Sequence, residues 1–212
     1  MMKIGIFGGT FDPVHMGHLR VAEEIRELFF LERIVFVPVF MPPHKRDCRI
    51  AEAEDRLHML KAGTRGNRFF QTSEIEIRRG GVSYTIDTLK SFEKRFKEVY
   101  FLIGIDAFSE INTWHAYREL FHHAHFIVMT RPARKQPSLL NALPHDMKDE
   151  VRALDESTLE HPSGKRIYLH EITQLDISST KIKELLKNGR SVRYLVPGSV
   201  ERYIYQRGLY RT

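Results

Sequence analysis

The strongest constraint on the fold is an alternation of short apolar runs with longer amphipathic segments along most of the chain. The short runs are typical of buried strands, and the longer segments repeat their apolar residues with the period of a helix. Strand, helix, strand is the pattern of right-handed βαβ units in a parallel sheet covered on both faces. The expected strands are 3–7, 34–39, 69–77, 99–105, 126–129 and 166–171, and the expected helices are 19–30, 51–62, 85–96, 108–122, 178–187 and 198–206.

We therefore predict a doubly wound, Rossmann-like α/β domain with a parallel sheet over residues 1–212, in which residues about 173–212 form a small C-terminal helical part. A chain of this length buries roughly 70% of its unfolded surface. Two segments, 40–50 and 132–162, break the alternation after strands, where open α/β sheets build their binding crevice. We interpret the first, which contains Pro42-Pro43-His44-Lys45, as a substrate clamp, and the second as a solvated excursion.

The net charge and the cysteine content limit the classes of ligand and the cellular compartment that are expected. The net charge of +6 favours phosphate-bearing ligands, but the basic residues are dispersed and no aromatic RNA-recognition pattern occurs. We expect small phosphorylated substrates and no nucleic acid. No apolar stretch approaches the ~20 residues that span a bilayer, so no membrane is expected. Cys48 is the single cysteine, which excludes an internal disulfide and indicates the cytoplasm. The sequence leaves a homodimer open.

A phosphate-binding turn is predicted directly after the first apolar run. Gly8 and Gly9 follow Ile4-Gly5-Ile6-Phe7, and glycines allow a sharp turn with open backbone N–H groups. His15 and His18 are three apart, so in a first helical turn both imidazoles project to one side, beside the positive end of the helix dipole. From spacing alone, a plain tight turn, a capping pair and a metal-binding pair of histidines remain open.

A second group of polar residues starts the helix expected at 178–187. Ser178, Ser179 and Thr180 offer hydroxyl and N–H groups, and Lys183 lies one turn further on the same side. Simple N-capping is the alternative interpretation of this start.

Both groups resemble signatures of the nucleotidylyltransferase superfamily. Residues 8–18, GGTFDPVHMGH, are similar to its H-x-G-H motif, and residues 177–183, ISSTKIK, are similar to its ISST-x-I-R motif. The resemblance spans residues 3–210. The long GGTFDP form, with Gly208-Leu209-Tyr210 near the end, is most similar to the bacterial adenylyltransferases for nicotinate mononucleotide. Lys183 stands where the motif has Arg, so the charge is kept without the bidentate fork.

The resemblance implies an enzyme that joins nicotinate mononucleotide and ATP to give deamido-NAD and pyrophosphate in NAD biosynthesis. We expect Mg²⁺ as the cofactor, bound as Mg-ATP and not in a site built from protein side chains, because the Asp residues are scattered without a D-x-D ligand pair. Alternatives are a pantetheine-phosphate adenylyltransferase, another nucleotidylyltransferase, or a nucleotide-binding module without turnover.

The same resemblance implies roles for individual residues. The expected catalytic residues are His15, His18 and Lys45, and the pyridine ring of the acceptor is expected at Thr85 and Trp114. We further expect a preference for the acid over the amide acceptor. The expected ATP-binding residues are Gly8, Gly9, Thr10, Phe11, Gly104, Asp106, Arg131, Ser178, Ser179, Thr180 and Lys183.

Overall fold

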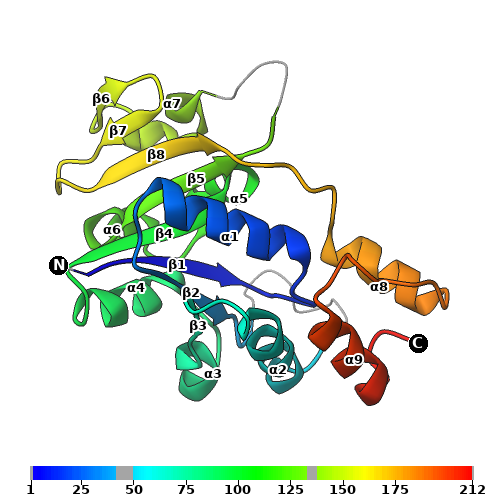
Figure 1. The fold of residues 1–212 in the computed structure, drawn as a ribbon. Helices are drawn as coiled ribbons and strands as arrows, with labels where there is room; N and C mark the ends of the chain where they lie inside the picture. The colour runs from blue at the N-terminus through cyan, green and yellow to red at the C-terminus, as the bar shows by residue number, and fades with distance from the viewer. Residues whose placement is uncertain (1, 42–49, 133–137, 212) are drawn as a thin grey trace.

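The computed structural model describes residues 2–41, 50–132 and 138–211, and it alternates strands and helices as expected (Figure 1). The strands are β1 (Lys3–Gly9), β2 (Arg33–Pro38), β3 (Phe70–Thr72), β4 (Glu98–Gly104), β5 (His125–Thr130), β6 (Arg152–Asp155), β7 (Thr158–Glu160) and β8 (Arg166–Glu171). The helices are α1 (Met16–Leu28), α2 (Ala53–Thr64), α3 (Ile75–Arg79), α4 (Thr85–Glu93), α5 (Ile105–Ser109), α6 (Tyr117–His123), α7 (Leu139–Ala142), α8 (Ser179–Lys187) and α9 (Gly198–Arg207), with 3-10 turns η1 (Ile111–Thr113) and η2 (His145–Met147).

The strands form one sheet in the order β3-β2-β1-β4-β5-β8-β7-β6. From β3 to β8 the neighbours are parallel. The chain leaves β1 toward β2 and β3, and later continues from β4 toward β5 and β8, so the direction of winding reverses between β1 and β4. In open α/β sheets the ligand crevice lies at the carboxyl ends of the strands at such a switch point.

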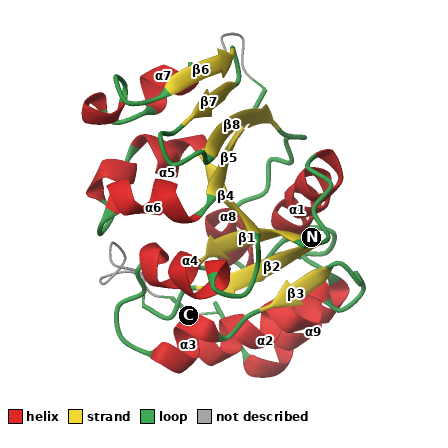
Figure 2. Cartoon of the chain, turned by 90° about the vertical axis from the view of Figure 1, so that its left-hand side faces the viewer, coloured by secondary structure: helices red, strands yellow, loops and turns green. Residues whose placement is uncertain are grey.

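Helices cover both faces of this sheet, which confirms the doubly wound arrangement (Figure 2). Strand side chains alternate between the faces. Val35 and Val37 of β2 are buried with α4, α5 and α6, whereas Ile34 and Phe36 are buried with α1 and α2. The two apolar layers hold the strand ends in fixed positions.

The last two helices pack on the same face as α1 and α2. Ile182 of α8 and Ile204 of α9 have no exposed surface and belong to the core cluster that contains Val14 and Ile25. The segment after residue 173 is therefore held beside the turn that follows β1.

The expected strand 69–77 is wrong over most of its length. Only Phe70–Thr72 pair with β2, and Ile75–Arg79 form the short helix α3. Arg78 makes an i,i+4 ion pair with Glu74 at 2.9 Å between Nη2 and Oε2, which is a helical spacing. Glu76 is buried, whereas Ile75 and Ile77 are only partly buried, which is the reverse of the burial that an apolar alternation of strand residues predicts.

The expected helix 108–122 is also wrong, because it is divided into α5, η1 and α6. The backbone is extended at Trp114, with φ −81° and ψ 144°, and left-handed at Ala116, with φ 52°. These conformations end the helix. Because the helix is interrupted, Trp114 and His115 lie near the carboxyl ends of the strands.

The excursion at 132–162 contains structure that the sequence did not predict. After α7 and η2, strands β6 and β7 form an antiparallel hairpin, and β7 pairs antiparallel with β8. The sheet is therefore parallel except at this edge. Among the described residues, none of the helices has the length and hydrophobicity that a bilayer crossing requires.

Candidate active site

The turn after β1 is built from a strained and tightly packed backbone. Phe11 is 2% exposed and has a positive φ of 48°, a conformation that non-glycine residues adopt only where packing enforces it. A Cβ on Gly9 would lie 3.1 Å from the Phe11 ring, so a larger residue there would displace it. The Phe11 ring packs against the rings of Phe7, His18 and Phe36 and thereby supports the turn.

His15 and His18 lie together where α1 begins. His15 is the N-cap residue, with extended φ and ψ of −141° and 170°, and its ring stacks on that of His18 with centroids 3.7 Å apart. The backbone N–H of His15 donates to Nδ1 of His18 at 3.3 Å. A neutral His18 that accepts at Nδ1 carries its proton on Nε2.

Burial sets the charge of both rings. It lowers the pKa of His15 to about 4, and it lowers the pKa of His18 well below the usual range, with the neighbouring His15 adding to the shift. Both imidazoles are therefore neutral at pH 7. Nδ1 of His15 is buried without a hydrogen-bond partner among the described residues. An unmatched buried polar atom of this kind is costly unless a ligand or water meets it.

Asp12 connects the turn to the C-terminal part of the chain. Its carboxylate is 4% exposed and accepts from Lys183 Nζ at 2.9 Å, Tyr210 O–H at 2.6 Å and the Ala51 N–H at 3.1 Å. The Lys183 amine, expected on phosphate, thus lies on Asp12 beside the turn. The sequence motif contained Asp12, but the scattered carboxylates gave no signal for this role.

Arg56 holds the turn against the end of β2. Its side chain is 1% exposed, and its guanidinium donates to the backbone oxygens of Thr10 at 2.9 Å, Val39 at 2.6 Å and Phe40 at 3.0 Å. Burial lowers the pKa of Arg56, while nearby acids, Asp12 first, act in the opposite direction. No sequence motif marked this residue, because its partners are backbone atoms brought together only by the fold.

The hydroxyls of Ser178 and Ser179 at the start of α8 already have partners. Ser178 is the N-cap, and its Oγ accepts from the Lys181 N–H at 3.2 Å, as the capping interpretation expects. Ser179 Oγ donates to the Pro13 carbonyl at 3.0 Å, which joins α8 to the turn. Thr180 lines a cavity of about 370 Å³ between α8 and the C-terminal residues, together with Lys183.

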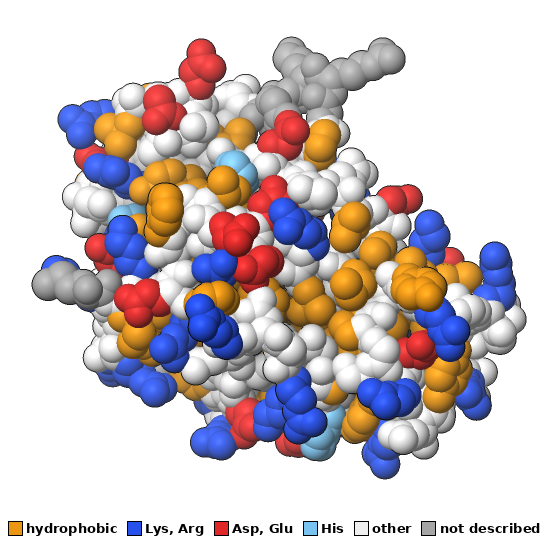
Figure 3. Space-filling view, viewed as in Figure 1, with side chains coloured by type: hydrophobic (Ala, Val, Ile, Leu, Met, Phe, Trp, Pro, Cys, Tyr) orange, Lys and Arg blue, Asp and Glu red, His pale blue; other side chains and the backbone are white. Residues whose placement is uncertain are grey.

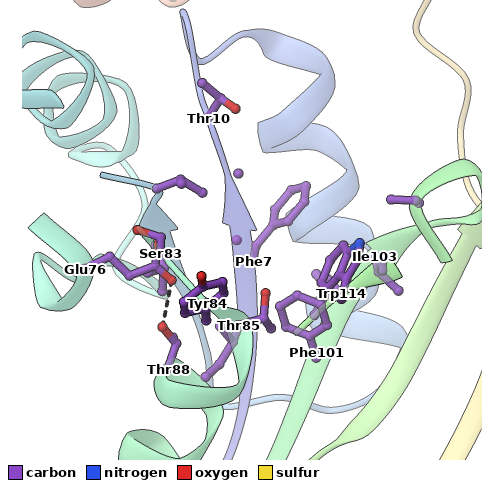
Figure 4. Close-up of a pocket in the computed structure, with 18 of the residues that line it drawn as sticks. Phe7, Thr10, Glu76, Ser83, Tyr84, Thr85, Thr88, Phe101, Ile103 and Trp114 are labelled. Atoms are coloured by element: carbon purple, nitrogen blue, oxygen red, sulfur yellow. Dashed lines mark hydrogen bonds between the residues drawn. The ribbon is translucent and has the colours of Figure 1, made fainter. Parts of the chain in front are cut away.

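A larger cavity of about 600 Å³ opens at the carboxyl ends of β1, β2 and β4 (Figure 4). Thr10 lies at one end, Trp114 and Phe101 lie on one side, and Thr85 lies at the base. Gly8, Gly9 and Gly104 also line it. The fold therefore brings the turn, Thr85 and Trp114 to one space, although they are far apart in the sequence.

The cavity also contains an acid that the sequence analysis missed. Glu76 of α3 is 5% exposed and accepts from Thr88 Oγ1 at 2.6 Å. Burial raises the pKa of Glu76, and the hydroxyls of Thr88 and Ser83 act in the opposite direction. The segment was taken as a strand, so nothing in the sequence pointed this side chain into a pocket.

Some of the remaining expected residues lie at the carboxyl edge of the sheet, and others fall outside the residues that the structure describes. Asp106 is exposed in the first turn of α5, and Arg131 is exposed just after β5, so both lie at the carboxyl edge of the sheet without lining the large cavity. Lys45 falls outside the described residues, as do Pro42, Pro43 and His44. Within the described residues, no group of three His, Cys, Asp or Glu side chains could hold a metal ion.

The fold and the sequence agree on a class of enzyme. The sequence profile of the cytidylyltransferase-like family matches residues 6–185, which defines the chain as a nucleotidyltransferase. A probable nicotinate-nucleotide adenylyltransferase of Desulfatibacillum aliphaticivorans is 42% identical over 99% of this chain and 100% of its own length. One of Pelobacter propionicus is 44% identical over 99% of this chain and 98% of its own length. The chain belongs to the nicotinate-nucleotide adenylyltransferase family.

Solved structures support the same fold. A nicotinic acid mononucleotide adenylyltransferase of Plasmodium falciparum, complexed with NaAD, superposes with a TM-score of 0.75 over 99% of this chain and 98% of its own, at 22% identity. The same enzyme complexed with APC gives a TM-score of 0.72 at 21% identity, with the same coverage.

Proposed function

We propose that the chain transfers the adenylyl group of ATP to nicotinate mononucleotide, giving deamido-NAD and pyrophosphate. An oxygen of the acceptor's 5′-phosphate attacks the α-phosphorus of ATP in line, and the bond from that phosphorus to the β-phosphate oxygen breaks as pyrophosphate leaves. No covalent enzyme intermediate is needed. The observation that carries the proposal is the single cavity that joins Gly8, Gly9 and Thr10 to Thr85 and Trp114.

The turn and the histidines form the proposed reaction centre. Neutral His15 and His18 each hold one N–H, and Nε2–H of His18 is the proton left free by the backbone bond to Nδ1. Donors of this kind stabilise the charge that develops on the transferred phosphoryl group. The backbone N–H groups of Gly9, Thr10 and Phe11 complete the cradle. Lys45 supplies a further cation in this proposal.

The start of α8 holds the leaving phosphates in this proposal. The backbone N–H groups of Ser179 and Thr180, the Ser178 hydroxyl and the Lys183 amine meet the β- and γ-phosphates. Lys183 lies within reach of the turn because Asp12 accepts from it at 2.9 Å. Gly104, Asp106 and Arg131 take the adenosine part at the neighbouring strand ends. Mg²⁺ enters on the phosphate oxygens of ATP and neutralises part of their charge.

The acceptor occupies the other end of the large cavity. The indole of Trp114 offers a face to the pyridine ring. Thr85 is the first residue of α4, and no side-chain hydrogen bond caps this helix at Tyr84, so its first N–H groups remain open. A carboxylate placed there is stabilised by these donors and by the helix dipole.

The cellular setting is proposed from simpler features. Residues 1–212 act as one domain in the cytoplasm, with 173–212 as an integral helical part, and nucleic acid is not a partner. Figure 3 supports the last point, because Lys and Arg side chains are scattered over the face of α1 and α8 among Asp and Glu. A homodimer is compatible with the exposed side chains of Phe30 and Tyr194, and sedimentation would measure it.

Pyrophosphate release tests the proposed reaction. With ATP and Mg²⁺ present, we expect release with nicotinate mononucleotide, less with nicotinamide mononucleotide, and none above background with phosphopantetheine. Nucleotide binding in calorimetry without release from any of the three acceptors would instead indicate a module without turnover.

A further inference from the structure

Arg56 of α2 joins three segments of backbone around the turn that follows β1. Its side chain is 1% exposed, so any part that it plays in the reaction is indirect. It uses four of the five N–H donors of a guanidinium, and every acceptor is a backbone carbonyl. The bonds run from Nη1 to Thr10 at 2.9 Å and Val39 at 2.6 Å, from Nη2 to Phe40 at 3.0 Å, and from Nε to Ala51 at 3.0 Å. One side chain therefore fixes the turn to the chain just after β2 and just before α2.

The bond from Arg56 to Thr10 sets the direction of the next backbone N–H. The peptide unit between Thr10 and Phe11 is planar and trans, so its C=O and its N–H point in opposite directions. Because Arg56 holds the carbonyl, the Phe11 N–H points away from Arg56 and from the end of β2.

The preceding peptide unit has the same arrangement. The Gly9 carbonyl accepts from the Val39 N–H at 3.0 Å, so the Thr10 N–H also points away from β2. Within the described part of the chain, neither the Thr10 nor the Phe11 N–H has a hydrogen-bond partner. On its other side β1 is followed by β4, and the winding reverses between these two strands, where the ligand crevice is expected. Two successive N–H groups that point to one side form a nest for an anion.

The charge of Arg56 favours the same class of ligand. Its bonded acceptors are carbonyls, which carry no net charge. Asp12, the acid that acts on Arg56 most strongly, is itself bonded to the Lys183 amine at 2.9 Å. A hydrogen bond from a cation to the Thr10 carbonyl also polarises the peptide unit, which strengthens its N–H as a donor.

Resting on the proposed function, we infer that Arg56 is a positioning residue: it holds the Thr10 carbonyl so that the N–H groups of Thr10 and Phe11 meet the phosphate that is transferred. Position and charge can be separated in Arg56→Lys. Lysine keeps the positive charge, but its single nitrogen cannot reach carbonyls of three segments in the geometry of a planar fork.

The experiment measures how much of the nucleotide affinity depends on phosphate. Calorimetry gives dissociation constants for adenosine and for α,β-methylene-ATP, whose bridge to the β-phosphate is not cleaved. In Arg56→Lys we expect the affinity for adenosine to stay within about threefold of the parent, and the ratio of the two dissociation constants to fall about tenfold. We also expect kcat to fall about 10- to 100-fold, while KM for nicotinate mononucleotide changes less than about threefold.

Arg26→Lys is the matched control. Arg26 is also a largely buried arginine, with a side chain that is 15% exposed and bonded to Glu23, but it lies in the last turn of α1, at the end remote from the histidines. Its ratio of dissociation constants and its kcat should equal those of the parent. Urea unfolding checks the folding of each variant, and Arg56→Gln serves if Arg56→Lys does not fold.

The parent provides a measurement that needs no variant. We expect the amide proton resonances of Thr10 and Phe11 to move on addition of α,β-methylene-ATP and to stay nearly unchanged with adenosine, because only the first ligand brings a phosphate to these N–H groups.

Three results would overturn the inference. One is a folded Arg56→Lys protein with the kcat and the affinity ratio of the parent. Another is an equal loss of affinity for both ligands, which would mean that Arg56 only stabilises the fold. The third is that α,β-methylene-ATP leaves the Thr10 and Phe11 amide resonances of the parent unmoved. Failure of the proposed function is distinct, because the parent would then bind the analogue but release no pyrophosphate with nicotinate mononucleotide.

Discussion

His15 and His18 show how a single residue's environment sets its chemistry. Burial lowers the pKa of both rings and keeps them neutral, so in the proposed reaction they serve as N–H donors and not as cations. We predict that His18→Ala lowers kcat by ~10²-fold or more, because it removes a donor whose value grows as charge develops on the phosphoryl group. Steady-state pyrophosphate release measures this effect. His145→Ala, which removes an exposed histidine of η2, should leave kcat unchanged. A folded His18→Ala protein with near-normal kcat would contradict the assignment.

Lys183 combines a contact in the structure with a proposed contact to ATP. Lys183→Ala would leave Asp12 Oδ2 without its cation and remove a phosphate ligand, so we predict a rise in KM for ATP of about tenfold. Lys183→Arg should keep or improve ATP affinity, because a guanidinium has enough donors for Asp12 and for phosphate together. Lys181→Ala is the control, since the amine of Lys181 pairs with exposed Asp176 at 3.8 Å. Equal KM values for ATP in Lys183→Ala and the parent would show that Lys183 does not contact the phosphates.

Candidate site residues were easiest to select from the sequence where they form a continuous motif. Gly8, Gly9 and both histidines lie within one segment, and the resemblance of that segment to a family motif, added to its spacing, indicated a shared site. Arg56 and Glu76 were not predictable. Arg56 contacts backbone oxygens from separate segments, and Glu76 reaches the cavity only because a short helix replaces the expected strand.

At the scale of elements, we propose that the start of α4 determines which acceptor nucleotide the cavity favours. Its open first-turn N–H groups suit a carboxylate, whereas an amide would turn NH₂ donors toward donors. We predict a preference for nicotinate over nicotinamide mononucleotide of roughly 5- to 150-fold in kcat/KM. Equal values, or a preference for the amide, would mean that a hydrogen-bond acceptor of the protein, such as a carboxyl oxygen of Glu76, faces the substituent on the pyridine ring.

The role of the α4 backbone can be tested with one substitution. Thr85→Pro removes the first N–H of the helix, yet proline is favoured at this position and the extended backbone of Tyr84 is compatible with a following proline. We predict that the acid-to-amide ratio falls about tenfold in Thr85→Pro and stays at the parent value in Thr85→Ala, which keeps the N–H. Competition between the two acceptors measures the ratio. A parent-like ratio in Thr85→Pro would show that this N–H does not meet the carboxylate.

Helices and strands with a regular apolar pattern in the sequence were predicted well, and irregular elements were not. The parallel strands other than β3, and the helices at 178–187 and 198–206, follow from their apolar patterns with clear stop signals. The interruption at 110–116 was missed because a left-handed alanine gives no sequence signal, as alanine is ordinarily a helix former. That interruption is also what brings Trp114 to the cavity.

For the whole molecule, the order of the strands explains why distant segments meet. β1 and β4 are neighbours, and the winding reverses between them, so the turn after β1, the end of β4 and the start of α4 face one space. Apart from the bounds of β3, the sequence predicted the parallel strands of this arrangement, but it did not predict the antiparallel hairpin β6–β7, whose strands have 4 and 3 residues. Strands this short lack the continuous apolar runs that mark the buried parallel strands.

Global stability should depend on pH through the same buried histidines. The folded pKa of His15, about 4, lies below the unfolded value near 6.5, so the unfolded chain binds more protons between these values. The contribution of neutral His15 to the free energy of unfolding is therefore fully present above pH 6.5 and decreases as the pH falls toward 4. His15 alone contributes a loss of about 2 kcal/mol between pH 7 and pH 5, and His18 shifts in the same direction.

Carboxyl groups do not account for the expected loss of stability between pH 7 and pH 5. Those with lowered pKa values, such as Asp146 and Asp155, lose their contribution only as the pH falls below about 4, and Glu76, with a raised pKa, acts in the opposite direction as a single group. Urea unfolding at pH 7, 6 and 5 measures the free energy of unfolding. We predict that it falls steadily in the parent and in His145→Gln, and that the fall is about 2 kcal/mol smaller in His15→Gln. Parallel curves for the parent and His15→Gln would mean that His15 titrates normally in the folded protein and can become a cation at the site.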